Sequence, residues 1–216
     1  MAKKPQNAPS PPADPVPDRR SRIIDAALDL AAARRWGDIS LADIAQAAGL
    51  PLIEVYQTYP SKVAILTGFA RSVDVAMLEG AAEWADEKPR DRLFEAILRR
   101  FDALGRHKAG VRNLLRDARS GQVPLLPGAV QFGRSMAWTL EATGIPVVGL
   151  QGAVRTKILG ALYLSVLRTW LRDDSADQAR TMALLDRRLR SVARWLGLGE
   201  GGAEADPPVA QADAQP

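Results

Sequence analysis

The sequence contains no cysteine and a single histidine, His107, among its 216 residues. The lack of cysteine excludes disulfides, iron–sulfur clusters and thiol nucleophiles, and it makes the cytoplasm the expected compartment. One histidine does not suffice for a His-rich metal site, and no carboxylate or serine is spaced to orient it as a general base. We interpret His107 as a solvated side chain, and the sequence predicts no catalytic residues, no metal site and no cofactor.

Long hydrophobic runs and an excess of acid are missing as well. The longest apolar run, near residues 158–167, is shorter than the roughly 18–20 residues that span a bilayer, so we expect no membrane span. The N-terminus also lacks the apolar centre of a secretory signal. Four acids and no base lie in residues 199–216, so omitting that tail would change the net charge from +4 to +8. A basic body favours a polyanionic partner.

The two ends of the chain have the composition of segments that do not fold. Residues 1–17 contain six prolines, and residues 199–216 are rich in Gly, Ala, Pro and acids. Neither segment buries enough apolar surface to offset its ordering entropy. We therefore expect a disordered arm at 1–17 and a disordered acidic tail at 199–216.

Between these ends, apolar residues recur at helical spacing, and no alternating run bounded by hairpin turns occurs. This pattern predicts an all-α fold. Ser40 and Asp43 fit a capping box, Gly49 suits the left-handed end of a helix, and Ser175 to Gln178 fits a second capping box. The expected helices cover residues 19–35, 41–48, 51–59, 61–84, 90–104, 108–119, 129–143 and 148–172, with a last one ending near 196.

Two short helices joined at Gly49 and packed on the helix at 19–35 predict a helix-turn-helix, whose second helix lies in the DNA major groove. The segments Ala42–Leu50 and Val55–Lys62 resemble the signature of the TetR-type repressors. The resemblance covers about residues 19–70. It implies a three-helix DNA-binding domain over 18–70, a helical ligand-binding and dimerisation domain over 71–198, and a homodimer built on the last two helices.

Carried over residue by residue, the resemblance implies that Ser40 and Lys62 contact phosphates and that the second helix of the motif faces the groove. The DNA-binding residues expected on this basis are Arg20, Arg22, Ser40, Leu41, Leu52, Glu54, Tyr56, Gln57 and Lys62. The chain departs from the family pattern over 51–54, where Pro, Leu, Ile and Glu stand in place of small, polar or basic residues. Gln57 is then the best base reader. Further candidates in the arm are Lys3, Lys4 and Arg19.

Other residues of the motif have two interpretations. Tyr59 is interpreted as a packing residue, because buried aromatic side chains usually belong to the core. For Tyr56, packing and groove contact remain equally open. Asp173 and Asp174 are adjacent and cannot face each other on a helix, so we interpret them as cap or turn residues.

The longer helices contain the candidates for an effector site and a dimer interface. From the resemblance we expect a small hydrophobic effector in the C-terminal helical domain. Its candidate lining residues, each of which also fits core packing, are Phe101, Met136, Trp138 and Tyr163. Apolar residues that step by three and four between Met182 and Leu196 have the pattern of an interface seam. The expected interface residues are Leu162, Val166, Leu185, Leu189 and Val192.

A second resemblance lies near the C-terminus. Residues of about 158–190 resemble the ubiquinone-biosynthesis lipid-binding protein family, whose fold is itself TetR-like, at Trp170, Asp174–Ser175, Thr181 and Leu185–Leu189. This resemblance implies a lipid ligand and a helix-turn-helix that no longer reads DNA. The Arg-rich face over 180–194 is interpreted as solvated, with an acidic-lipid contact as the alternative. Two functions therefore stay open: a TetR-type repressor released from an operator by its effector, and a lipid-binding protein of the same fold.

Overall fold

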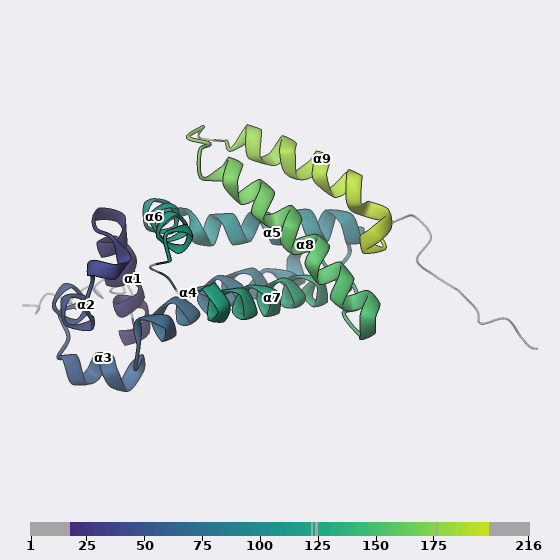
Figure 1. The fold of residues 1–216 in the computed structure, drawn as a ribbon. Helices are drawn as coiled ribbons and strands as arrows, with labels where there is room; N and C mark the ends of the chain where they lie inside the picture. Colours follow the sequence, from purple (N-terminus) through teal and green to yellow (C-terminus); the bar gives the residue numbers. More distant parts are fainter. Residues whose placement is uncertain (1–17, 122, 124, 176, 199–216) are drawn as a thin grey trace, which may run out of the picture. The chain divides into compact units, whose positions relative to one another are not determined.

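The computed structural model describes residues 18–121, 123, 125–175 and 177–198. Within these ranges the chain is all α and contains no strand (Figure 1). The arm predicted at 1–17 and the tail predicted at 199–216 lie outside the described residues. The α-helices are α1 (Arg19–Ala33), α2 (Leu41–Ala48), α3 (Leu52–Thr58), α4 (Lys62–Glu79), α5 (Pro89–Gly105), α6 (Lys108–Arg119), α7 (Leu125–Ala142), α8 (Gly149–Trp170) and α9 (Ala179–Leu196). Two 3-10 helices are η1 (Trp36–Asp38) and η2 (Ala81–Trp84).

The described residues form two compact units. The first contains the residues up to Phe69 together with Ala109–Leu125, and the second contains Ala70–Lys108 together with the residues from Leu126 onward. The sequence predicts one break near residue 70 and an unbroken second domain over 71–198. The structure differs, because most of α6 packs with the first unit.

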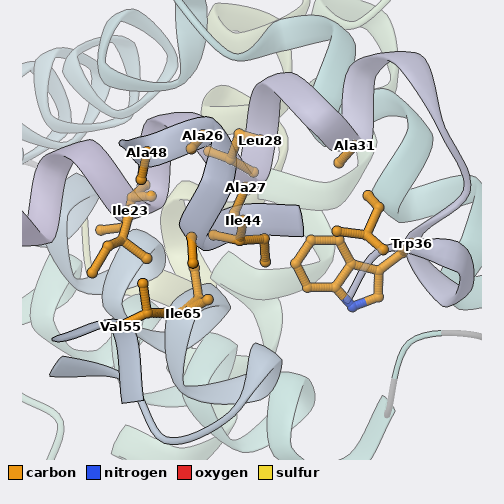
Figure 2. Packing of buried hydrophobic residues seen from close by; sticks show 13 residues of the cluster. Ile23, Ala26, Ala27, Leu28, Ala31, Trp36, Ile44, Ala48, Val55 and Ile65 are labelled. Atoms are coloured by element: carbon orange, nitrogen blue, oxygen red, sulfur yellow. The ribbon is translucent and has the colours of Figure 1, made fainter. Parts of the chain in front are cut away.

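Helices α1, α2 and α3 enclose the core of the first unit (Figure 2). Ile23 of α1, Ile44 of α2, Val55 of α3 and Ile65 of α4 have no exposed surface. Figure 2 shows these side chains gathered together, with the Trp36 indole at one side of the cluster. The burial follows from the helical spacing of the apolar residues, because positions three and four apart share one face. This core holds α3 in place.

Helix α6 is fixed to α1 by close packing and by two polar side chains. Gly110 brings the two backbones together, since a Cβ here would lie 2.5 Å from the carbonyl oxygen of Leu28. The Asn113 amide donates to two carbonyl oxygens in the last turn of α1, at 3.0 and 2.8 Å. The Asp117 carboxylate accepts from the backbone N–H of Trp36 at 2.7 Å. These bonds satisfy backbone groups that the end of a helix leaves without partners.

The second unit has an aromatic interior. Helices α8 and α9 form an antiparallel pair in Figure 1, and α5 contacts both of them. Phe101 of α5 stacks on Tyr163 and Trp170 of α8, with ring centroids 5.1 and 5.5 Å apart. Phe132 of α7 lies 5.8 Å from Tyr163. Aromatic pairs of this kind contribute about 0.5–1.5 kcal/mol each beyond their buried area.

Three local predictions differ from the structure. The helix predicted over 61–84 ends at Glu79, and residues 81–84 form η2. Between them lies Gly80, where the lack of a Cβ leaves room for the guanidinium of Arg99. The helix predicted from 129 begins at Leu125. His107, predicted to be solvated, is buried, because the short turn that joins α5 to α6 brings it inside.

The second predicted capping box does not form. Helix α9 begins at Ala179, after Gln178 in a left-handed conformation without a side-chain cap. The Ser175 hydroxyl instead donates to Asp173 at 2.5 Å, and the Thr181 hydroxyl donates to the same carboxylate at 2.7 Å. These hydrogen bonds hold the pKa of Asp173 well below its usual range. The interpretation of Asp173 as a turn residue is confirmed.

Candidate functional site

Helices α2 and α3 form a helix-turn-helix whose turn is fixed at both ends of α2. The Ser40 hydroxyl accepts from the N–H of Asp43 at 3.0 Å, and the Asp43 carboxylate accepts from the N–H of Ser40 at 2.8 Å, which confirms the predicted capping box. These bonds lower the pKa of Asp43. Gly49 ends α2 at φ 62°, a left-handed conformation that glycine adopts without strain. The Arg22 guanidinium donates to the carbonyl oxygens of Ala48 and Gly49 at 2.7 and 3.1 Å.

The seven residues of α3 present an exposed face that is mainly apolar. Leu52, Ile53 and Tyr56 are 50%, 59% and 59% exposed, and Gln57 is exposed beside them. Val55, on the other side of the helix, is fully buried. For Tyr56 the structure therefore favours groove contact over packing, the two interpretations that the sequence left open.

Two residues of the motif pack inward. Leu41, expected to contact DNA, and Tyr59, interpreted as a packing residue, are both half-buried against the core of the first unit. Burial raises the pKa of the Tyr59 hydroxyl. The ring of Tyr59 occupies the space beside Gly68 of α4 that a Cβ would need. Tyr59 thus joins the end of α3 to α4.

Lys62 is bound within the first unit. Its ammonium group donates to the carbonyl oxygens of Trp36 and Ile39 at 2.6 and 2.7 Å and lies 5.0 Å from the centre of the Trp36 ring. Burial holds the pKa of the Lys62 amine below its usual value. Two of the three ammonium donors are therefore used by the backbone of the loop between α1 and α2. We assign Lys62 a structural role in place of the expected phosphate contact.

The arginines near α3 differ in their availability. Arg22 is bound to the end of α2, whereas Arg20 keeps an exposed side chain. Glu54, the acidic residue of α3, is half-buried, and its carboxylate lies 3.0 Å from the Nε of Arg19. This ion pair at the protein surface neutralises the charge of Glu54. Such a pair contributes little to stability. Among the residues that the structure describes, the candidate DNA interface thus combines an apolar α3 with a small number of cations.

Replacing Lys62 tests its assignment. We expect Lys62→Met to lower the free energy of unfolding by about 1–3 kcal/mol, because two charge-assisted hydrogen bonds are lost while the apolar stem is kept. The slope of log Kd against log salt for DNA binding should not change, since no phosphate contact is removed. Urea unfolding and DNA titrations at several salt concentrations give both quantities.

Arg20→Gln is the matched control for Lys62→Met. It should leave the stability unchanged and make the salt slope smaller by about one, as expected for the loss of a phosphate contact. A fully stable Lys62→Met protein with a smaller salt slope would show that Lys62 contacts phosphate after all.

A second candidate site is a cluster of polar side chains buried in the second unit. Arg100 of α5 donates to Asp74 of α4 at 2.6 Å and to the hydroxyl of Ser135 of α7 at 2.5 Å, and Ser135 in turn donates to Asp74. The Arg100 guanidinium lies 5.5 Å from the ring centre of Tyr163, whose hydroxyl pKa is raised by burial. All four side chains are buried. Within the described residues, Nε of Arg100 has no hydrogen-bond partner.

The structure separates the four expected effector-site residues. Phe101, Met136 and Tyr163 are buried in the interior of the second unit, whereas Trp138 is 56% exposed on α7. Positions 136 and 138 are two residues apart, so they point to different sides of a helix. Trp138 therefore lies apart from the other three residues, and its place in an effector site stays a prediction.

Four of the five expected interface residues belong to the core of a single chain. Leu162 and Val166 of α8 and Leu185 and Leu189 of α9 have almost no exposed surface. The reason is that α9 folds back on α8, and the apolar stripes of the two helices meet within one chain. These four side chains therefore pack within the single chain, and their place in an interface stays a prediction. Val192 is half-buried.

A different apolar stripe of α8 is exposed. Leu150, Val154, Ala161 and Leu164 step by four, seven and three and therefore share one face of the helix. All four are exposed in the single chain, Leu150 to 84%. We call this set the α8 stripe. Sequence reasoning missed it because α8 is apolar over most of its circumference, so its pattern does not indicate which side faces water.

In the part of the chain that the structure describes, no three His, Asp or Glu side chains are grouped so that they could hold a metal ion. Likewise, none of the described helices has both the length and the apolar character that crossing a bilayer requires.

The chain has the fold of the TetR-family transcriptional regulators, which confirms the predicted all-α architecture. The crystal structure of the TetR transcriptional regulator from Nitrosomonas europaea ATCC 19718 is 25% identical, with a TM-score of 0.65 over 81% of this chain and 98% of that chain. A TetR-family regulator from Streptomyces coelicolor is 20% identical, with a TM-score of 0.54 over 87% and 86%. A TetR regulator from Rhodococcus sp. RHA1 is 18% identical, with a TM-score of 0.51 over 79% and 95%. The likeness supports a transcriptional regulator at the level of the fold.

The C-terminal region is similar to a second family. The COQ9 family model matches residues 155–195, which cover most of α8 and α9. This match agrees with the second resemblance seen in the sequence. No curated protein sequence matches the chain.

Proposed function

We propose that the protein is a TetR-type transcriptional regulator that binds an operator in double-stranded DNA through its helix-turn-helix. The exposed face of α3 carries the proposal. In this motif the second helix enters the major groove, and Leu52, Ile53, Tyr56 and Gln57 are side chains that α3 exposes to solvent. The fold of the structural relatives supports the proposal. A regulator of this kind acts in the cytoplasm, next to the DNA, and performs no catalytic step.

The second unit supplies the proposed effector site. Phe101, Met136 and Tyr163 belong to an apolar interior that also contains Arg100. Ligand sites are mainly apolar with a few fixed polar groups, so we propose a small hydrophobic effector with one acceptor group for the unused Nε donor of Arg100. In a repressor, the effector binds best to a state in which the two recognition helices do not match the operator half-sites. Effector binding then releases the protein from the DNA.

We further propose that the protein is a homodimer that uses the α8 stripe. Helix-turn-helix dimers bind two half-sites one helical turn apart, and a two-fold interface uses the same patch on both copies. The α8 stripe is an exposed apolar face of one helix, interrupted by the exposed Lys157, and exposed apolar patches mark interaction sites.

Charges in the α8 stripe should abolish the dimer. We expect Val154→Asp combined with Leu164→Asp to give a monomer by light scattering and to weaken operator binding at least about tenfold, since two linked half-site contacts become one. The double variant should keep the helical circular-dichroism spectrum of a folded chain, because both side chains are exposed in the single chain. Its apparent stability should fall only by the loss of association, which depends on protein concentration. Val75→Asp, at an exposed position of α4, is the control and should stay dimeric. A dimeric double variant would show that the interface lies elsewhere.

The alternative function is a lipid-binding protein of the same fold that no longer reads DNA. The COQ9 match over 155–195 favours it. So do Lys62 and Arg22, whose cations are bound within the first unit. The arginines of α9 and Trp195 are exposed, which suits a surface of acidic lipid headgroups.

Two measurements separate the two functions. A regulator should retain specific DNA fragments in the presence of nonspecific competitor and should lose affinity steeply as salt rises. A lipid carrier should ignore DNA and copurify with lipid, which organic extraction and mass spectrometry detect. Specific retention without copurified lipid would support the regulator. Copurified lipid without retention of DNA would overturn it.

A further inference from the structure

We infer that the exposed face of α3 reads the C5-methyl groups of thymine in the major groove. This thymine-reading face consists of Leu52, Ile53 and Tyr56. The inference rests on the proposed function, because it concerns how the same helix tells one DNA sequence from another. It predicts operators whose half-sites are rich in thymine at the positions that α3 touches.

The side chains of α3 match thymine and adenine and do not match the other two bases. Arg and Lys are the residues that read guanine, and Asp and Glu accept from cytosine. The sequence of α3 contains neither Arg nor Lys, and its acid, Glu54, is paired with Arg19. The thymine methyl is the apolar group of the major groove, and three side chains of α3 are suited to it. Gln57 suits adenine, the partner of thymine.

The packing of α3 fixes this face outward. Val55 is fully buried in the core of the first unit, and Tyr59 packs on α4. The helix therefore cannot rotate to bury Leu52 and Ile53 without exposing Val55. Lys62 and Arg22, two cations of the described motif, are bound internally and are therefore not free to supply phosphate contacts. Apolar contacts to bases then carry a larger share of the binding free energy, and base contacts are the ones that distinguish sequences.

The test replaces thymine with uracil, which lacks the C5-methyl group. Genomic fragments amplified with dTTP are selected on the purified full-length protein, and the selected sequences are then remade with dUTP. We expect the thymine form to bind at least about tenfold more tightly than the uracil form. Each buried methyl group should raise the affinity about fourfold, and the effects of two such contacts multiply. Competition titrations with the two forms of one selected duplex give the ratio.

Variants of α3 separate this face from any effect of uracil on the DNA itself. Leu52→Ala combined with Ile53→Ala should weaken binding to the thymine form and remove most of the preference for thymine over uracil. Both side chains are exposed, so the midpoint of urea unfolding should not change. Gln57→Ala is the control and should weaken both forms by the same factor, because its amide contacts an adenine edge rather than a methyl group.

Three outcomes contradict the inference, and they are distinguishable. Equal binding of the two forms by the unmodified protein would overturn it and leave the proposed function standing. A thymine preference that survives in the Leu52→Ala, Ile53→Ala variant would place the methyl contacts elsewhere. Retention of no genomic fragment in either form would overturn both proposals and would leave a protein or a lipid as the partner of this face.

Discussion

Replacing Asp74 with alanine is expected to lower the free energy of unfolding by about 3–5 kcal/mol. Asp74 accepts hydrogen bonds from Arg100 and Ser135 in the interior of the second unit, where all three side chains are buried. Without the carboxylate, the guanidinium stays buried with its charge uncompensated, and the desolvation penalty of that charge dominates the loss. In a chain of this size the thermal midpoint should fall by roughly 10 °C.

Two companion variants isolate the charge. Asp74→Asn keeps an acceptor oxygen for Arg100 and should cost less than Asp74→Ala. Asp74→Leu combined with Arg100→Met removes both charges and should recover most of the loss, because apolar residues replace a buried ion pair at little cost. Urea unfolding followed by circular dichroism measures each change. A loss below about 1 kcal/mol in Asp74→Ala, the range of exposed salt bridges, would contradict the burial of the pair.

Replacing Gly110 with valine is expected to lower the free energy of unfolding by about 3 kcal/mol. A Cβ at this position would lie 2.5 Å from the carbonyl oxygen of Leu28, and valine adds two further methyl groups to that atom. Backbone atoms cannot move aside as a flexible side chain can, so α6 must shift away from α1. The shift would also lengthen the hydrogen bonds from Asn113 to the last turn of α1.

Gly133→Val is the matched control. Gly133 lies inside α7, and nothing approaches within 4 Å of the position of its Cβ. Valine is a somewhat better helix former than glycine, so the free energy of unfolding should stay constant or rise by about 0.5 kcal/mol. Equal losses at the two positions would show that valine in a helix, rather than the contact with Leu28, causes the effect.

Features that depend on neighbours in the sequence could be predicted. Ser40 and Asp43 cap α2 as their spacing predicts, and Gly49 ends it in the left-handed conformation. Both signals act over three residues or fewer, so no tertiary contact has to be known. Ser175 shows the limit of the same rule. Its spacing fits a capping box, but the carboxylate of Asp173 binds its hydroxyl instead.

Features that depend on distant partners could not be predicted. The carbonyl groups that bind Lys62 lie 23 and 26 residues earlier in the chain. An apolar stripe such as that of Leu185 and Leu189 shows that one face is buried, but it does not show whether the partner is the same chain or a second copy. Helical period alone therefore could not separate core from interface.

One residue of the buried cluster around Arg100 could have been recognised from the sequence. Arg100 lies seven residues after Leu93 and four before Leu104, both of which are buried, so it shares their side of α5. A charge in the apolar stripe of a helix indicates a buried partner or a binding site, because an uncompensated charge there is costly. Its partners Asp74 and Ser135 lie on other helices, and the sequence around them does not indicate that they contact Arg100.

We propose that the protein binds specific DNA sites as a dimer. The most direct measurement incubates the purified protein with fragmented genomic DNA at near-physiological salt and sequences the fragments that it retains. We predict enrichment of a few sites that contain an inverted repeat, with half-site centres about 10 base pairs or a multiple of that distance apart. Recovery of no enriched site, or of fragments that share no repeat, would contradict the claim.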